Sequence, residues 1–268
     1  MHAQASDQIR FEQPALGLQR LSARFGGHAY DLHRHETYAV GVTLWGAQSF
    51  HYRGALRTSR QGQVMVIHPD EAHDGHAGVD QGFAYRMLYV DPGAVSAALD
   101  GATPPFVPDV VSEDAPLAHL VREAFADFPR ALEPLAADAI VERLANRLAV
   151  RGDGRKPKRG TRAQRAVLQA RDFLVAESRR TVASEELERV SGLDRFTLAR
   201  QFRAAFGTSP HRFQLGQRLA KAQAMIAAGT SLSEAAAAAG FADQSHLTRH
   251  FAARYGLTPG RWATLSRA

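Results

Sequence analysis

The chain has 268 residues, of which 45% are hydrophobic and 22% are charged, and it contains no cysteine. This length and apolar content suit two ordinary globular domains, and the lack of cysteine excludes disulfides, thiolate zinc sites and sensing through a reactive thiol. The sequence has no apolar run of about 18 residues and no basic start followed by an apolar core, so we expect a cytoplasmic protein without a membrane partner.

Charge is divided unevenly along the chain. Residues 151–268 hold 21 Lys and Arg against 9 Asp and Glu, a net charge of +12, whereas the first 150 residues carry a net charge of −6. A basic half joined to an acidic half is typical of a phosphate-binding module attached to a domain with another task. We therefore predict an acidic domain over 1–150 with a task other than phosphate binding, a flexible basic linker over 151–160 and a DNA-binding domain over 161–268.

The first 92 residues alternate short apolar runs with turn residues. The runs predict strands at 10–11, 18–25, 38–45, 48–53, 63–67 and 83–90. Gly and Pro separate them at the spacing of a sandwich or barrel, and we expect a small antiparallel β-barrel with flanking helices. Such a barrel can enclose one small ligand. Along 38–45 we expect one face to line that pocket, made by Tyr38, Val40, Val42 and Leu44.

Histidines are concentrated in the expected barrel. His33 and His35 are two residues apart, so on a strand both point to the same face, and His73 follows the turn at Pro69. This pattern resembles the histidine motif of cupin barrels, where imidazoles hold a metal. The candidate ligand-binding residues are His33, His35, Tyr38, His68 and His73.

The cupin resemblance is incomplete in two respects, and one of them is that Glu71 stands where a glycine is expected. Ala39 or Val40 stands where a cupin metal site has its glutamate. We therefore expect no metal at His33, His35 and His73, and no other cofactor, but a pocket that uses histidines for hydrogen bonding and pH-sensitive charge.

Beyond Pro92 the apolar residues follow a helical period, which predicts helices at 94–99, 117–125 and 135–148. The last of these has an apolar stripe made of Leu135, Ile140 or Val141, Leu144 and Leu148. The stripe can pack on its own barrel, which we prefer, or form the seam of a homodimer. A further helix is expected at 162–178, with Val167, Leu168, Phe173 and Leu174 turned inward.

Residues 181–265 repeat one pattern with an offset of 49 residues. LeuAlaArgGlnPhe at 198–202 recurs as LeuThrArgHisPhe at 247–251, and Gly207 recurs as Gly256. Each copy has a first helix, a glycine-centred break and a second helix, a pattern that is typical of a helix-turn-helix unit. We expect Asp194 and Asp243 to cap the second helices.

Helical spacing gives each second helix a buried side and a free side. The residues expected to face inward are Leu198, Phe202, Phe206, Leu247, Phe251 and Tyr255. The residues expected to contact DNA are Arg195, Phe196, Ala199, Arg200 and Arg203 in the first copy and Gln244, Ser245, His246 and Arg249 in the second. Arg and Gln suit bidentate contacts to guanine and adenine, although any one Arg can equally belong to a solvated helix face.

These residues resemble the DNA-binding domain of the AraC/XylS family of bacterial transcription regulators. The resemblance is carried by 192–202, by GlyThrSerProHis at 207–211 and by 239–251. It implies two helix-turn-helix subdomains joined by a long helix from Pro210 to about Ala228. It also implies that residues 1–150 form a cupin-like domain for ligand sensing and dimerisation. Ala199 departs from the longer polar side chain that is common in the family at this position.

The resemblance implies a sequence-specific, ligand-responsive activator that is not an enzyme. Its expected partners are double-stranded DNA, a small-molecule effector and, as a candidate, RNA polymerase. The two recognition helices would read adjacent major grooves about 34 Å apart. The alternative from another class is a metal-dependent cupin enzyme fused to a DNA-binding domain, against which the missing carboxylate counts. A DNA binder without a ligand is disfavoured, because the acidic first half adds nothing to phosphate binding.

Overall fold

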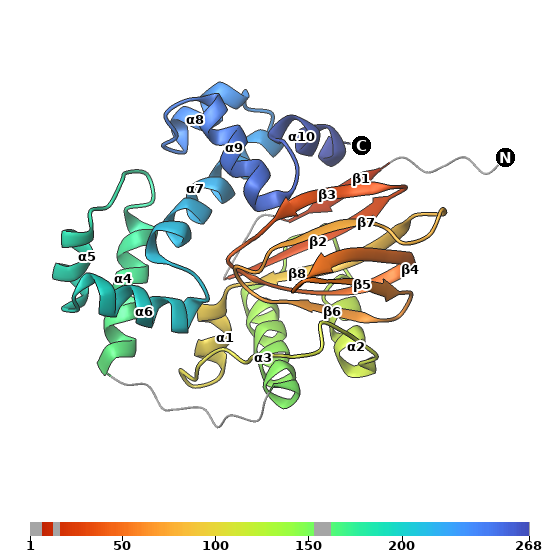
Figure 1. Cartoon of the computed structure of the whole chain (residues 1–268), viewed down its shortest axis with the longest axis horizontal. Coiled ribbons are helices and arrows are strands. Elements are labelled where there is room, and N and C mark those ends of the chain that lie inside the picture. The colour runs from red at the N-terminus through yellow and green to blue at the C-terminus, as the bar shows by residue number, and fades with distance from the viewer. Residues whose placement is uncertain (1–6, 13–16, 153–161, 268) are drawn as a thin grey trace.

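The computed structural model describes residues 7–12, 17–152 and 162–267, and Figure 1 shows a β domain with helices beneath it and a helical domain beside it. The strands are β1 (Gln8–Phe11), β2 (Leu18–Phe25), β3 (His28–His33), β4 (Tyr38–Tyr52), β5 (Ala55–Arg60), β6 (Val64–Ile67), β7 (His73–Ala77), β8 (Phe83–Val90) and β9 (Val111–Ser112). The helices are α1 (Pro92–Ala98), α2 (Ala115–Glu123), α3 (Pro134–Arg151), α4 (Arg162–Ala176), α5 (Ser184–Ser191), α6 (Arg195–Phe206), α7 (Pro210–Ala227), α8 (Leu232–Ala238), α9 (Gln244–Tyr255) and α10 (Pro259–Arg267).

The β domain is organised by the long strand β4, which belongs to two layers. Its first half lies in the layer ordered β1-β2-β8-β4-β6-β9, and its second half pairs with β5 and with β7, which in turn pairs with β3. Every one of these pairings is antiparallel. The strand changes layer near Gly46, whose φ of 69° is left-handed and whose Cβ would meet the carbonyl oxygen of Gly82 at 2.0 Å, so the sharp bend requires glycine here. The two separate strands expected at 38–45 and 48–53 are therefore one.

The outer face of the first layer is covered by α2 and α3. Tyr38, Val40 and Val42 are buried in this cluster with Leu88, and Leu44 packs against it. The expectation that Tyr38, Val40, Val42 and Leu44 line the pocket is therefore wrong. Alternation along a strand distinguishes two faces but does not say which one a helix covers.

The α3 stripe packs within its own chain. Ile140, Val141, Leu144 and Leu148 are buried in the cluster that α3 shares with α1, α2 and the strands, as preferred over a dimer seam. Leu135, which was assigned to this stripe, lies in the first turn of α3 and is 83% exposed.

Arg20 ties β2 to the segment between α2 and α3. Its side chain is fully buried, pairs with Glu12 at 2.5 Å and donates to the carbonyl oxygens of Ala124, at 2.6 Å, and Arg130. The guanidinium also lies over the rings of Phe125 and Phe128. A buried charge with this many partners fixes the segment to the sheet.

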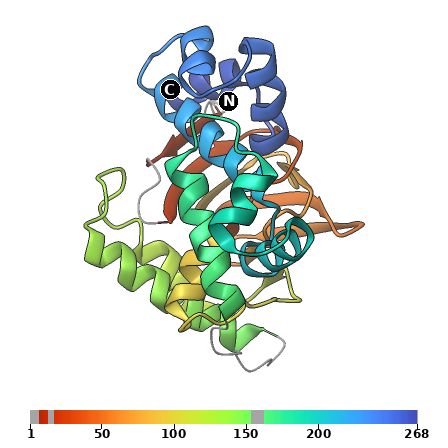
Figure 2. The same ribbon diagram turned by 90° about the vertical axis from the view of Figure 1, so that its left-hand side faces the viewer.

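The helical domain contains the two expected helix-turn-helix units, α5–α6 and α8–α9, joined by α7. The first unit has its own core with α4, built on Leu198, Phe202 and Phe206. The inward positions of Val167 and Leu174 are confirmed, Phe173 is partly buried, and Leu168 is wrong, because it is 36% exposed on the outer side of α4. In Figure 2, α7 leads from the first unit up to the second, and α4 lies beside the first unit.

The second unit shares one apolar cluster with the β domain. Leu247 and Phe251 of α9 belong to the same buried cluster as Phe25 and Tyr85. Trp262 of α10 is 1% exposed, and its ring lies 4.9 Å from that of Phe11 on β1. The two halves of the chain are thus joined by a hydrophobic interface.

Strands β3, β5 and β7 were not expected from the sequence, because they are rich in polar residues and histidine.

The linker predicted over 151–160 lies largely outside the described residues. The domain boundaries at 150 and 161 therefore stay predictions. Among the described residues, no helix is both long and apolar enough to cross a membrane.

Replacing Arg20 with Leu should destabilise the fold by about 3–5 kcal/mol, because Glu12 and two carbonyl oxygens would remain buried without their donor. Urea unfolding followed by circular dichroism measures the change. Arg24, exposed on the same strand, is the control, and Arg24→Leu should change stability by no more than about 0.5 kcal/mol. Equal losses in the two variants would contradict the role given to Arg20.

Candidate DNA-binding surface and sensor cavity

The two second helices are started and stopped by matching residues. Asp194 caps α6 by accepting from the backbone N–H groups of Phe196 and Thr197, and Asp243 caps α9 by accepting from His246 at 2.7 Å. Each helix ends at a glycine with left-handed backbone, Gly207 and Gly256. The expected caps are confirmed. In both helices the candidate DNA contacts begin at the capped N-terminal end.

The free face of each helix is open to solvent. Leu198, Phe202, Phe206, Leu247 and Phe251 are buried as expected, and Tyr255 is partly buried. The exposed candidates are Arg195, Phe196, Ala199, Arg200, Arg203, Gln244, Ser245 and Arg249, and His246 is half-buried. Phe196 is 77% exposed, an unusual position for a large aromatic side chain.

Two of these candidates already have partners in the protein. Arg195 contacts Glu188 at 3.3 Å and Glu185 at 3.7 Å, both on α5. The ring of His246 accepts from the backbone N–H of Ala242 at 3.3 Å and packs on Phe241. Arg200 and Arg249 make no such ion pair among the described residues, which leaves their charge free for a nucleic acid.

A cavity of about 630 Å³ lies between the β domain and the helical domain. Strands β2, β4 and β8 form one wall with Leu21, Ala39 and Met87, and α4, α7, α9 and α10 form the other. The small side chain of Ala39 is on the face of β4 opposite Tyr38 and Val40, and this difference in size leaves room for the cavity. The volume is that of a small-molecule site.

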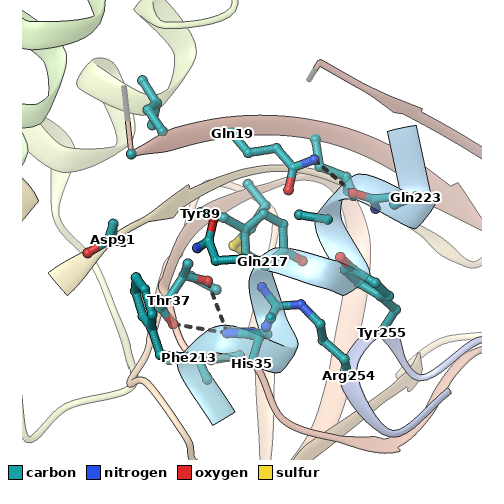
Figure 3. A pocket seen from close by; sticks show the side chains of 18 of the residues that line it. Gln19, His35, Thr37, Tyr89, Asp91, Phe213, Gln217, Gln223, Arg254 and Tyr255 are labelled. Carbon is teal, nitrogen blue, oxygen red and sulfur yellow. Dashed lines mark hydrogen bonds between the residues drawn. The ribbon is translucent and has the colours of Figure 1, made fainter. Parts of the chain in front are cut away.

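Polar groups reach the cavity from both domains, as Figure 3 shows. Gln19 of β2 donates to Gln223 of α7 at 3.4 Å across it. Arg254 of α9 pairs with Glu36, and neither side chain is more than 15% exposed. Burial raises the pKa of Tyr89, so its hydroxyl stays protonated and can donate.

Three of the five candidate ligand-binding residues meet in this cavity. His33, His35 and His73 are each less than 8% exposed, and one ring nitrogen from each lies within 4.8 Å of the others. Burial, together with the neighbouring imidazoles for His33 and His35, lowers the pKa of all three, so they are neutral at pH 7.

The other two candidates lie elsewhere. The Tyr38 hydroxyl donates to the carbonyl oxygen of Pro105 at 2.6 Å, and the His68 ring bonds to Val107 and stacks on Phe106. Neither lines the cavity. Both bind the strands to the connector that follows α1, which is a structural role.

Sequence reasoning missed the cavity residues that come from the helical domain. Gln217, Gln223 and Arg254 were assigned to a linking helix and to the end of a recognition helix, where polar residues are ordinary. The sequence offered only a weak signal for them, namely the glutamines on α7, the helix that joins the two helix-turn-helix units. Only the packing of the two domains brings them to the sensor.

A cavity joined to two helix-turn-helix units whose second helices are capped and exposed is the arrangement of a ligand-binding protein that acts on DNA. Residues 15–145 match the family of AraC-like ligand binding domains, and residues 187–264 match a helix-turn-helix domain family. The chain belongs to the AraC family of transcription regulators: a sequence-specific DNA-binding protein with a cupin-like ligand-binding domain.

Solved structures of ToxT from Vibrio cholerae share this fold over the whole chain. A single-residue variant of ToxT in its apo form aligns with a TM-score of 0.66 and 9% identity, covering 94% of this chain and 99% of that one. ToxT bound to an unsaturated fatty acid aligns with a TM-score of 0.63 and 8% identity, covering 99% and 98%. ToxT bound to (E)-4-(8-methylnaphthalen-1-yl)but-3-enoic acid gives 0.64 and 9%, covering 97% and 99%. No curated protein sequence matches the chain.

Replacing Asp243 with Ala should lower stability by about 1 kcal/mol and weaken DNA binding, because the first turn of α9 loses its cap and frays. Thermal unfolding and electrophoretic mobility shift measure the two effects. Asp243→Asn keeps the acceptor oxygen and should behave like the unmodified protein. If Asn is as damaging as Ala, the carboxylate charge and not the cap is what matters.

Proposed function

We propose that the protein regulates transcription by reading two adjacent major grooves, one with α6 and one with α9, under control of a small molecule bound between its domains. The observation that carries this proposal is that the cavity wall includes Arg254 and Tyr255, at the end of a helix whose first turns present the candidate DNA contacts. One rigid element therefore connects effector and DNA.

The DNA side of the proposal rests on exposure. The free faces of α6 and α9 stay open while the opposite ends of both helices are docked on the β domain: Gly207 lies against Pro69, and Gly256 lies against His33 and Tyr30. These glycines are the equivalent positions of the 49-residue repeat. Docking therefore leaves the DNA contacts free and fixes how the two helices are placed relative to each other.

We expect Arg200 and Arg249 to read bases, with Phe196, Ala199, Arg203, Gln244, Ser245 and His246 beside them. Arg195, held by two glutamates, is better placed to contact phosphate.

Replacing Arg200 or Arg249 with Ala should cost about 1–3 kcal/mol of binding at particular base pairs, because a bidentate contact to a base edge is lost. Affinity measured over a set of single-base operator variants reveals these positions. Arg189→Ala, on the exposed side of α5, is the control and should leave the sequence preference unchanged. A uniform loss on every sequence would mean that the two arginines touch phosphate only.

We infer that the effector is an amphipathic molecule with an anionic head, most simply a carboxylate. The β wall combines apolar side chains such as Leu21 and Met87 with the three histidines. The opposite wall presents glutamines and Arg254, whose Nε has no hydrogen-bond partner among the described residues. An anion entering here could take the guanidinium from Glu36. The two ligand-bound ToxT structures described above contain carboxylic acids, which supports this class.

Effector binding would then act by population shift, since a ligand that prefers one arrangement of the domains stabilises it. The Arg254–Glu36 pair and the Arg212–Asp70 pair both join the domains and are the contacts that a ligand can exchange. We propose activation, with RNA polymerase as a partner, action in the cytoplasm and dimerisation on DNA. The described cavity residues do not favour a cupin enzyme over a sensor.

A panel of aliphatic carboxylates that includes unsaturated fatty acids should contain compounds that stabilise the full chain, by about 2.7 kcal/mol at 100 times the Kd. Thermal shift measures this effect. Arg254→Met should abolish it, whereas Arg249→Met, on the exposed face of the same helix, should retain it. Stabilisation only by neutral sugars, or an unchanged effect in Arg254→Met, would overturn the assignment of the anion site.

A further inference from the structure

The three cavity histidines are oriented by the same kind of bond. Each Nδ1 donates to a backbone carbonyl oxygen two residues away: His33 to Asp31 at 2.8 Å, His35 to Thr37 at 2.9 Å and His73 to Glu71 at 3.0 Å. A carbonyl oxygen can only accept, so the proton of each neutral ring sits on Nδ1. The lone pair of each Nε2 is therefore free.

The three rings come together, with one ring nitrogen from each within 4.8 Å of the other two. Because each Nδ1 is bonded to a carbonyl oxygen, Nε2 is the nitrogen left to bind a ligand. The Nε2 of His35 is fully buried with no hydrogen-bond partner among the described residues. Buried acceptors that face one another are costly unless a donor or a cation lies between them. In known metal sites a histidine ligand donates its other ring N–H to a carbonyl or carboxylate, which is the arrangement seen at all three rings.

We propose that His33, His35 and His73 bind one divalent first-row transition metal through their Nε2 atoms. Neutral imidazoles suit zinc, iron, nickel and copper. Zinc–nitrogen bonds are about 2.0–2.1 Å long, so small rotations of the rings would close the site. This inference departs from the expectation, drawn from the missing glutamate, that no metal binds. Three histidines suffice as protein ligands for zinc and leave one position open.

The open position faces the cavity between the domains, which the three histidines line. A metal there would offer an anionic effector a second positive partner besides Arg254. This part of the inference rests on the proposed function, whereas metal binding itself does not.

The site also touches the second recognition helix. A Cβ at Gly256, the residue that ends α9, would lie 2.7 Å from Nδ1 of His33. On either side of that histidine, the N–H of Asp31 donates to Gly256 at 2.9 Å, and the N–H of Arg34 donates to Ala253 at 3.1 Å. A metal that fixes the position of His33 would therefore also fix the strand segment to which the end of α9 is hydrogen-bonded.

The test uses the full chain stripped with a chelator, dialysed, and reloaded with Zn²⁺. Elemental analysis should find about one zinc per chain, and the Tm should rise on loading, because only the folded state holds the three ligands together. Co²⁺ loading should give the visible absorption of a four-coordinate site. His33→Gln, His35→Gln and His73→Gln should each lower the affinity by at least about tenfold, with loss of that spectrum.

His76→Gln is the matched control, because His76 lies on the same strand as His73 but outside the cluster. It should bind zinc as the unmodified protein does, and circular dichroism of all four variants shows which of them fold. The proposal is overturned if the folded, unmodified chain retains no zinc after dialysis, or if the three cluster variants bind as much as the control. Carboxylate-induced stabilisation of the metal-free chain that is lost in Arg254→Met would, in that case, leave the proposed function standing.

Discussion

The structure depends on one hydrophobic interface, where α9 and α10 pack against the first strands. Trp262 is the centre of this interface, buried between Phe11 of the β domain and Phe251 of its own helical unit. Because the apolar cluster is continuous across it, the second helix-turn-helix unit and the sensor share a single core. The cavity and the placement of α9 both depend on this contact between the two domains.

The two DNA-binding units are therefore not equivalent, although their sequences repeat. The first has a core of its own with α4 and meets the β domain through the tip of α6, where Phe206 approaches Gly93 and Gly207 approaches Pro69. The buried residues of the second belong instead to the cluster shared with the strands. Arg254 and Tyr255 of α9 line the cavity themselves, whereas α6 meets the cavity wall through Gly93 of α1, which Phe206 approaches. In the proposed mechanism, the effector therefore acts on the position of one recognition helix relative to the other.

The features that sequence could predict are those fixed by local chemistry. The repeat, the caps at Asp194 and Asp243, the buried positions of both second helices and the solvent-facing arginines follow from helical spacing and from hydrogen bonding within a few residues. The cavity does not, since it is made by packing: the alternation at 38–45 was read correctly as two faces, but the helices cover the bulky face and the cavity lies over Ala39. The three histidines could be grouped because two lie two residues apart, although β3 ends at His33 and His35 lies in the loop that follows. Their common Nδ1 bonding could not be foreseen, since it depends on the local backbone at Asp31, Thr37 and Glu71.

The shared core also bears on how such regulators can be recombined. Exchange of whole sensor barrels between relatives is usually pictured as a cut in the connector between domains. In this chain a cut there would remove the strand residues against which α8, α9 and α10 pack. A foreign barrel would have to reproduce the surface around Phe11 and Tyr30 to bind these helices. The unit that can be exchanged between relatives is accordingly the β domain together with the C-terminal helices that pack on it. Relatives that have exchanged sensor domains should have kept these two parts together.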